Sequence, residues 1–543
     1  MSDTRSLQVA GYIVGEATPT EFIFVSPRDN YPPRWEYLVV ESREQVGGEL
    51  RDVMVLAQVE LIASESQVLT KQLDIEAVRR ICEARLNTIN VWGKARILGY
   101  LAEGEDGQVE VLLPRRAVVP GNPVYIAPRE VLERFFSYPS EEGLHIGCLI
   151  SRPDVPVYVS VRGFRRHLAI LAQTGAGKSY TAGVLIEELL EKGATIIVID
   201  PHADYVFLSQ TQDGRKYRLA ERITVFRNPG STGRYSGKDI RNLRSFEISF
   251  ADLEPEDIFG ILSIPEKWAY VRDAIKTAVE RLRGRGEAYS PADLLAELDE
   301  MAAEGVIDDD RCRSAKVHLQ PLLRLPVFGA SSVSISQILR PQHVSVIDLS
   351  GLTDTSMDYI VSWLLNQVYQ EVRTGRWSYP VFVFIEEAHK FIPSQSEKGQ
   401  KKTYSSGIIN TLAAEGRKFG IFLVLISQRP FKIHSDSLSQ CNSQIIMKIT
   451  NPRDQTAVMN ASERLSHELM QDLPGLNVGE AIVVGEITRV PVMIRVRRRQ
   501  TREGGADIDI LAKLREARID RRSREEMREM DAKTIDSGEF VEV

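Results

Sequence analysis

A glycine-rich segment that ends in lysine and serine has the residue types and spacing needed to hold a triphosphate. Residues 172–179, Ala-Gln-Thr-Gly-Ala-Gly-Lys-Ser, match the phosphate loop G-x-x-x-x-G-K-[ST] except that Ala172 replaces the first glycine. In such a loop, successive backbone N–H groups surround the β-phosphate, the lysine reaches the β- and γ-phosphate oxygens, and the hydroxyl holds Mg²⁺. None of these contacts uses the side chain at position 172. We expect a nucleotide to bind at these residues: Thr174, Gly175, Ala176, Gly177, Lys178, Ser179 and Tyr180.

The segments on either side of the loop have the pattern of a strand and a helix. An apolar run over 167–171 precedes the loop, a helical run over 179–192 follows it, and a second apolar run covers 195–199. This succession predicts a βαβ unit of a parallel sheet. A glycine-rich turn that binds no ligand is the alternative interpretation, but it does not account for the motif and its context together.

Further along the chain, another apolar run, Val381 to Ile385, is followed by the acids Glu386 and Glu387. At the end of a strand, Glu386 is suited to hold Mg²⁺ through water, and Glu387 is suited to orient and deprotonate an attacking water as general base. A common form of this motif has aspartate where Glu386 stands. Two solvated acids are the alternative for the pair taken alone. Beside a phosphate loop, the pair predicts hydrolysis of the nucleotide rather than phosphoryl transfer to a substrate hydroxyl.

The apolar run 421–426 has candidate catalytic residues on both sides. Gln428 follows the run and is expected to sense the γ-phosphate by hydrogen bonding. Arg417 precedes it and is expected to stabilise charge on the phosphoryl group bound by a neighbouring subunit. Arg429 is the rival for this role, and an ordinary surface arginine is the alternative for Arg417. An arginine that acts on a neighbour would make the enzyme active only as a ring.

The composition is that of an ordinary globular protein, with 543 residues, of which 43% are hydrophobic and 26% charged. The four cysteines form no CxxC pair, so a disulfide framework and a zinc site are both disfavoured and a reducing compartment is favoured. No apolar run reaches the length of a membrane span, and we expect a cytoplasmic protein without a membrane partner. The net charge of −7 does not exclude DNA, because a basic channel can lie inside an acidic shell.

Hydrophobic patterning divides the chain into five parts and predicts an α/β protein. Short alternating runs within 1–145 are typical of a small β-barrel. Residues 146–250 and 331–500 supply the two parts of a core with a parallel-rich sheet, and the helical period makes 251–330 a helical insertion. Residues 501–543 form a charged helical tail.

Together, these motifs resemble the HerA family of ring-forming ATPases within the HerA/FtsK group of DNA translocases. Family members often carry Gly and Glu where this chain has Ala203 and Asp204. The N-terminal strands look like the small barrel of this family, so the resemblance covers most of the chain. Besides the phosphate loop and the acids, it includes these segments: Asp200-Pro201-His202-Ala203-Asp204-Tyr205, Glu415-Gly416-Arg417-Lys418, Ser427-Gln428-Arg429-Pro430, Leu473-Pro474-Gly475-Leu476 and Gly479-Glu480-Ala481.

The resemblance implies a RecA-like P-loop ATPase core that binds ATP and Mg²⁺ and works as a homohexamer around DNA. It implies that Arg166, just before the strand that enters the phosphate loop, contacts nucleotide. It also implies a partner on the barrel side, either a NurA-like nuclease in DNA end resection and repair or an antiphage effector such as a Sir2-like NADase.

Two other functions compete with a translocase. The first is an ATP-bound ring scaffold that assembles and activates the effector without processive movement. The second is a secretion or conjugation ATPase, which would need a membrane tether. The sequence leaves open the polarity of movement and whether the ring is sixfold or sevenfold.

Two basic segments are candidates for DNA contact, because grip on a moving strand needs side chains that bind backbone phosphates. One is Arg227 to Arg244, with Arg234, Lys238 and Arg241, and the other is Lys398 to Lys402. Solvated loops are the alternative for both. His202 and His389 have no second histidine or cysteine at ligand spacing, so we expect them to lie at a helix start or to form hydrogen bonds rather than to bind a metal.

Overall fold

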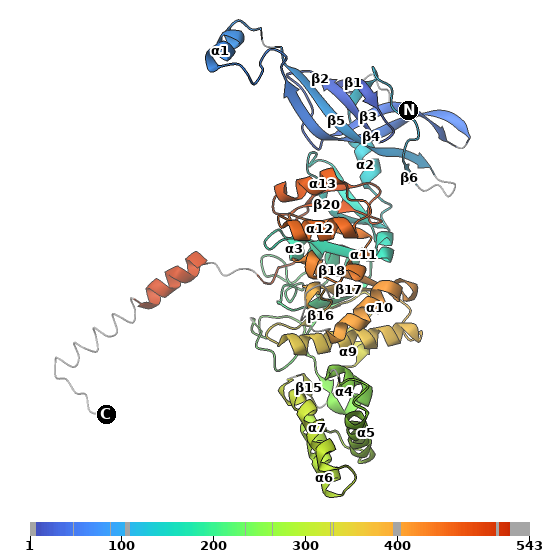
Figure 1. The fold of residues 1–543 in the computed structure, drawn as a ribbon, viewed down its shortest axis with the longest axis vertical. Coiled ribbons are helices and arrows are strands. Elements are labelled where there is room, and N and C mark those ends of the chain that lie inside the picture. Colours follow the sequence, from blue (N-terminus) through green and yellow to red (C-terminus); the bar gives the residue numbers. More distant parts are fainter. Residues whose placement is uncertain are drawn as a thin grey trace, which may run out of the picture.

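The computed structural model describes residues 7–46, 48–86, 88–103, 109–233, 235–262, 264–325, 327–329, 331–394, 403–505 and 510–521. Figure 1 shows a β-barrel, a layered α/β body and a helical body that follow one another along the long axis. This is the predicted fold class: a P-loop ATPase core with a small N-terminal barrel and a helical insertion.

Six strands close the N-terminal barrel. They run in the order β2-β1-β7-β3-β4-β5, the β2–β5 pairing closes the ring, and β6 extends the edge of β5. Buried and more exposed residues alternate along β2, and buried side chains such as Phe22, Phe24 and Leu38 fill the interior. The strands are β1 (Val9–Ala17), β2 (Glu21–Ser26), β3 (Tyr37–Val46), β4 (Glu49–Glu65), β5 (Asn90–Glu103), β6 (Val109–Leu112) and β7 (Pro123–Ile126), with helix α1 (Ile75–Glu83) between β4 and β5.

The central body is built on a sheet with the strand order β13-β12-β16-β11-β17-β18-β10-β19-β20-β21-β8-β9. Strands β13 through β19 in this order pair in parallel, and β19 through β9 pair antiparallel. Its strands are β8 (Gly143–Leu149), β9 (Pro156–Ser160), β10 (Leu168–Leu171), β11 (Thr195–Asp200), β12 (Ile223–Arg227), β13 (Leu243–Ser245), β16 (Val344–Asp348), β17 (Val381–Ile385), β18 (Ile421–Ser427), β19 (Ser443–Ile446), β20 (Glu480–Val484) and β21 (Val492–Val496).

The parallel strands are buried on both faces because helices cover the sheet. Strands β10, β11, β16 and β17 consist entirely of buried residues, as continuous apolar runs predict. The helices of this body are α3 (Lys178–Glu191), α8 (Ile335–Ile338), α9 (Asp354–Arg373), α10 (Tyr404–Phe419), α11 (Ser435–Ser439), α12 (Pro452–Ala461) and α13 (His467–Asp472). Parallel pairing places the C-terminal ends of these strands at one edge of the sheet, and this edge carries the site described below.

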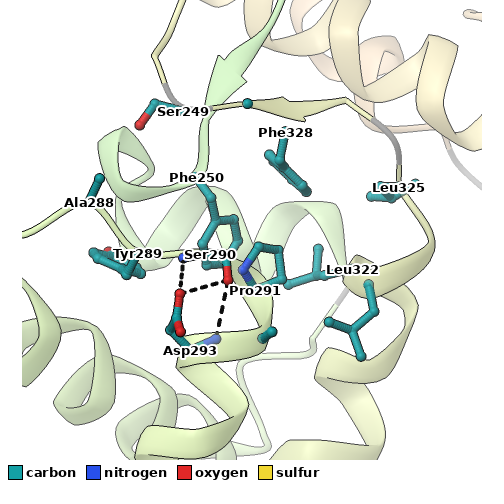
Figure 2. A pocket seen from close by; sticks show the side chains of 13 residues that line it. Ser249, Phe250, Ala288, Tyr289, Ser290, Pro291, Asp293, Leu322, Leu325 and Phe328 are labelled. Carbon is teal, nitrogen blue, oxygen red and sulfur yellow. Dashed lines mark hydrogen bonds between the residues drawn. The ribbon is translucent and has the colours of Figure 1, made fainter. Parts of the chain in front are cut away.

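The helical insertion consists of α4 (Pro255–Ile261), α5 (Ala269–Gly284), α6 (Pro291–Ala303) and α7 (Asp309–Leu319). It is joined to the central body by the short pair β14 (Ile248–Ser249) and β15 (Phe328–Gly329). A hollow of about 470 Å³ lies beside the N-terminus of α6 (Figure 2). Two of its polar residues, Ser290 and Asp293, bond to each other in a capping box at the start of the helix.

After β21 the chain returns along α3 as an extended segment, residues 497–505, and a helix over 510–521 then stands apart from the body (Figure 1). No helix in the described ranges is both long and apolar enough to cross a membrane.

Polar contacts join the barrel to the central body. The buried carboxylate of Asp472, at the end of α13, accepts from the indole N–H of Trp35 at 3.0 Å and pairs with Arg34 at 2.5 Å. At a second joint, Arg489 donates to the carbonyl of Arg134 in α2 (Arg129–Phe136) at 3.0 Å and stacks on Tyr138.

We expect Asp472→Ala to lower the free energy of unfolding by about 1 to 3 kcal/mol, because it leaves the Trp35 indole N–H without its acceptor and removes the ion-pair partner of Arg34. Urea unfolding of the full chain measures this change. The matched control is Asp52→Ala, which removes an exposed ion pair with Arg43. We expect this control to lower the free energy of unfolding by less than about 1 kcal/mol. Equal effects of the two variants would contradict a specific joint at Asp472.

Candidate active site

The phosphate loop connects β10 to α3, and its backbone is open to a ligand. Gly175 and Gly177 have φ values of 77° and 103°, a region that side chains rarely adopt. Among the described residues, the amides of Thr174, Gly175 and Gly177 have no hydrogen-bond acceptor. The start of the loop is bonded to the end of β18, because the Ala172 amide donates to the Ser427 carbonyl at 3.2 Å. The arrangement leaves backbone N–H groups available for phosphate oxygens at the start of a helix.

Lys178 lies against the two acids that follow β17. Its ammonium pairs with Glu386 Oε1 and lies 3.1 Å from Glu387 Oε1. Burial raises the pKa of Glu386, which is fully buried, and the Lys178 charge opposes that shift. Burial would lower the pKa of Lys178, but the charges of Glu386 and Glu387 outweigh it and raise that pKa. The ammonium therefore stays charged beside the two acids.

Glu387 is held in place by its neighbours. Its backbone has φ 51°, a left-handed conformation that is uncommon for a residue with a side chain. Gln428 Nε2 donates to Glu387 Oε1 at 2.6 Å, and His389 Nδ1 lies 3.2 Å from Oε2. The Gln428 amide oxygen accepts from the Thr174 hydroxyl of the phosphate loop. Gln428 thus connects the loop to the acid, because β18 lies between β10 and β17.

Ser179 is surrounded by oxygen ligands of the kind that Mg²⁺ prefers. Its hydroxyl donates to Asp204 Oδ2 at 2.8 Å and lies 3.3 Å from Glu386 Oε1. Tyr205 donates to the other oxygen of Glu386 at 2.8 Å. A hydroxyl beside two carboxylates fits Mg²⁺, which takes few protein ligands and completes its shell with water and phosphate. Across the described residues, no cluster of three histidine, cysteine or acidic side chains forms a metal site by itself.

Asp204 and Tyr205 were not among the expected site residues, although the motif that contains them follows a strand of the parallel sheet. The turn depends on Asp200, whose carboxylate accepts from the amides of Asp204 at 2.9 Å and Tyr205 at 2.8 Å. Burial and the nearby charges of Asp204 and Asp348 raise the pKa of Asp200. The position of Asp200 at the end of β11, next to β17, is the signal that could have identified this turn.

Arg166 and Arg417 lie at the opposite edge of the sheet from the phosphate loop of their own chain. Arg166 ends the 3₁₀ turn before β10, and Arg417 lies in the last turn of α10 before β18. Both are exposed, and His167 lies between them, bonded to Ala413 O and to the Leu423 amide at 3.0 Å each. Burial lowers the pKa of His167 to about 4, and the charge of Arg417 adds to that shift. Arg429, by contrast, follows Gln428 at the same edge of the sheet as the phosphate loop, and its side chain is exposed.

The remaining expected residues have mixed positions. The Tyr180 hydroxyl accepts from the Arg499 amide at 2.7 Å, so its ring faces the C-terminal segment. Arg227 forms an ion pair with Asp348 at 2.5 Å and donates to the Tyr235 carbonyl, so its guanidinium already has partners within its own chain. Lys238 and Arg241 are exposed, whereas Arg234 and the segment Lys398 to Lys402 lie outside the described residues.

The two histidines differ in their contacts. His389 Nδ1 lies 3.1 Å from the Ser427 hydroxyl, as expected of a hydrogen-bonding side chain. The His202 side chain is exposed and only its backbone amide donates to Asp200, at 3.3 Å, so the role expected of its ring stays a prediction.

The parallel sheet, the phosphate loop and the adjoining acids define the chain as a P-loop ATPase. The family model for the central domain of the helicase HerA matches residues 144–368. The DNA double-strand break repair helicase HerA of Pyrococcus furiosus is 30% identical over 93% of this chain and 96% of its own length. The helicase of the same description from Sulfurisphaera tokodaii is 29% identical over 94% and 97%. The chain therefore belongs to the HerA helicase family.

Solved structures with a similar arrangement are more distant. VirB4 of Thermoanaerobacter pseudethanolicus has a TM-score of 0.48 at 17% identity, covering 66% of this chain and 96% of VirB4. The plasmid coupling protein TrwB in complex with an ATP analogue has a TM-score of 0.49 at 15% identity, covering 69% of this chain and 94% of TrwB.

We expect Lys178→Ala to destabilise the nucleotide-free protein more at high pH than at low pH. Removing the ammonium raises the pKa of Glu386 further above that of an unfolded glutamate, about 4.3. The native variant then retains a proton that the unfolded chain has lost, so its stability relative to the unchanged protein falls as pH rises from about 5 to about 8. Each unit of extra pKa shift is worth about 1.4 kcal/mol. Urea unfolding at both pH values tests this, and a pH-independent difference would contradict the ion pair.

Proposed function

We propose that the protein is an ATP-driven DNA translocase that works as a homohexamer with ATP sites between subunits. The observation that supports this most directly is the set of side chains gathered at the C-terminal edge of the sheet: Lys178, Ser179, Glu386, Glu387 and Gln428. Membership of the HerA helicase family, whose relatives are described as DNA double-strand break repair helicases, supports DNA as the polymer that is moved.

In the proposed reaction, the phosphate loop holds ATP through its free amides and Lys178 neutralises charge on the β- and γ-phosphates. Glu387 orients a water for attack on the γ-phosphorus and accepts its proton, and Gln428 keeps the carboxylate turned toward the loop. Ser179 and Glu386 would hold Mg²⁺, which would supply charge neutralisation at the phosphate oxygens. Departure of phosphate leaves the Lys178 ammonium free to return to the acids.

The position of the two arginines supports a shared site. Arg166 and Arg417 precede strands β10 and β18, whereas the phosphate loop and Gln428 follow them. Four residues of β10 span about 13 Å, which keeps both guanidinium groups away from the phosphates of their own chain. In a ring, the arginine edge of one subunit faces the nucleotide edge of the next. We therefore assign Arg417 to the phosphoryl group of a neighbour and Arg166 to its nucleotide.

The proposed partner docks on the barrel side of the ring and is a NurA-like nuclease in end processing or another effector, such as a Sir2-like enzyme, in antiphage defence. The exposed Lys238 and Arg241 follow β12 and are the described candidates for contact with DNA phosphates.

We expect duplex DNA to raise ATP hydrolysis by the purified full-length protein, and Glu387→Gln to lower the turnover rate about 100-fold or more while ATP still binds. The amide keeps the shape of the side chain but cannot accept a proton. Phosphate release and binding of a fluorescent ATP analogue measure the two effects, and Glu463→Gln is the exposed control.

A translocase also loses displacement of a bound third strand from duplex DNA in Glu387→Gln. Effector activation that survives in that variant would favour a ring scaffold instead. Hydrolysis that does not respond to DNA, with any natural partner present, would contradict the proposal.

We expect inactive Arg417→Ala subunits to regain hydrolysis when mixed with inactive Glu387→Gln subunits. In an equal mixture, about a quarter of the interfaces join an intact acid on one subunit to an intact arginine on the next. Steady-state hydrolysis against mixing ratio measures the rescue. Lys178→Ala mixed with Glu387→Gln is the control that regains nothing, because both residues belong to one chain's half of the site. Failure of the first mixture at every ratio would place Arg417 outside its neighbour's site.

A further inference from the structure

The extended segment 497–505, called the strap below, is bound along the helix that follows the phosphate loop. The buried carboxylate of Glu187 in α3 accepts from the backbone amides of Gln500 at 2.9 Å and Thr501 at 2.7 Å, and from the Thr501 hydroxyl at 2.8 Å. Arg497 pairs with Glu188 at 2.8 Å. These contacts fix the strap on α3 before the chain continues to the helix over 510–521.

Arg499, in the middle of the strap, is a fully buried cation whose hydrogen bonds all go to neutral oxygens. It donates to the Thr501 hydroxyl at 3.0 Å and to the carbonyls of Ser179 and Arg502 at 3.3 Å each. Its charge acts on two carboxylates only from a distance: burial raises the pKa of Glu503 and the charge of Arg499 opposes that shift, and the Thr501 hydroxyl that accepts from Arg499 donates in turn to Glu187. A charge buried in this way is costly, so its retention calls for a role beyond packing.

Two neighbours of Arg499, Tyr205 and Gly183, leave space for its guanidinium close to the phosphate loop. Its guanidinium lies 5.9 Å from the ring centre of Tyr205, the residue whose hydroxyl bonds to Glu386. A Cβ on Gly183 of α3 would lie 2.4 Å from the guanidinium, so a larger residue there would displace it. Glycine inside a helix is unfavourable by about 0.5 to 1 kcal/mol relative to alanine. The helix therefore accommodates Arg499 at some cost to its own stability.

The far end of the strap supports the turn that carries Asp204. Ala203 has φ 61°, a left-handed conformation that is strained for alanine. The Gly504 amide donates to the Asp204 carbonyl at 2.9 Å, and a Cβ on Gly504 would lie 2.0 Å from the Ala203 carbonyl oxygen. The strap thus touches both halves of the Ser179–Asp204 pair, through the Ser179 carbonyl and through the backbone of the turn.

We propose that Arg499 is a positioning residue for the magnesium side of the active site. It holds the Ser179 end of α3 and the 203–205 turn at the separation that places the Ser179 hydroxyl 2.8 Å from Asp204 Oδ2. Arg499 itself touches neither nucleotide nor metal. The inference rests on the proposed function, since it assigns to the strap the affinity of that site for Mg²⁺.

The test is Arg499→Met in the full-length protein, with Arg498→Met as the matched change at an exposed neighbouring position. We expect the Mg²⁺ concentration for half-maximal ATP hydrolysis to rise about tenfold or more in Arg499→Met, with the rate at saturating Mg²⁺ kept within about twofold, as when an outer partner of a metal ligand is lost. Arg498→Met leaves both values unchanged. Adding Ala203→Gly to Arg499→Met, which relieves the strain of the turn, restores part of the Mg²⁺ affinity.

A second measurement needs no catalysis. Hydrogen–deuterium exchange of the nucleotide-free protein is expected to quicken at residues 201–211 and 179–181 in Arg499→Met but not in Arg498→Met. A change in melting temperature alone, with exchange there and Mg²⁺ dependence unchanged, would overturn the proposal. If Arg499→Met does not fold, Arg499→Lys perturbs the contact of the strap with Ser179, and Gly504→Ala perturbs its contact with the turn that carries Asp204. A wild-type protein that hydrolyses no ATP would defeat the proposed function, while the exchange comparison would still decide the role of the strap.

Discussion

The structure depends on one buried electrostatic contact, the pairing of the Lys178 ammonium with Glu386 and Glu387. A buried charge is costly unless it is compensated, and here two acids share one cation. A triphosphate would compete with these acids for the same ammonium. The contact requires the loop after β10 and the end of β17 to lie at the same edge, with β18 between them. Gln428, at the end of β18, occupies that middle position and bonds to both sides.

The same parallel sheet separates the residues of one chain into two groups. Acids, lysine and glutamine follow their strands, whereas Arg166 and Arg417 precede theirs. Because parallel strands all point one way, no adjustment of a loop brings the two groups together within one subunit. In the proposed ring this separation is useful, since a site completed by a neighbour links hydrolysis to assembly. His167, bonded between the two arginine-bearing elements, keeps their relative position fixed.

Two strained backbone positions, at Ala203 and Glu387, lie beside the phosphates' expected place and are held by different parts of the chain. Glu387 is held by Gln428 and His389, from the neighbouring strand and its own turn. The turn at Ala203 is held by the strap, which reaches it because the antiparallel strands β20 and β21 bring the chain back to α3. The antiparallel side of the sheet therefore contributes to the site although it carries neither the phosphate loop nor the acids that follow β17.

The sequence by itself determined the fold class, the family and the elements on which the motifs lie. Motifs and apolar runs are local features of the sequence, so each can be recognised without knowing which residues lie near it in space. The assignments of roles to Glu387, Arg417 and Gln428 remain predictions, as does that of Arg166. The tertiary structure decided which residues meet: the contact of Gln428 with Glu387, the position of Arg417 at the far edge and the place of Asp204 beside Ser179. It also decided that Arg227 is committed to Asp348 and that Arg499 is buried near the phosphate loop. These contacts join residues up to about 320 positions apart, and such pairings are set by strand order and burial, which no local pattern encodes.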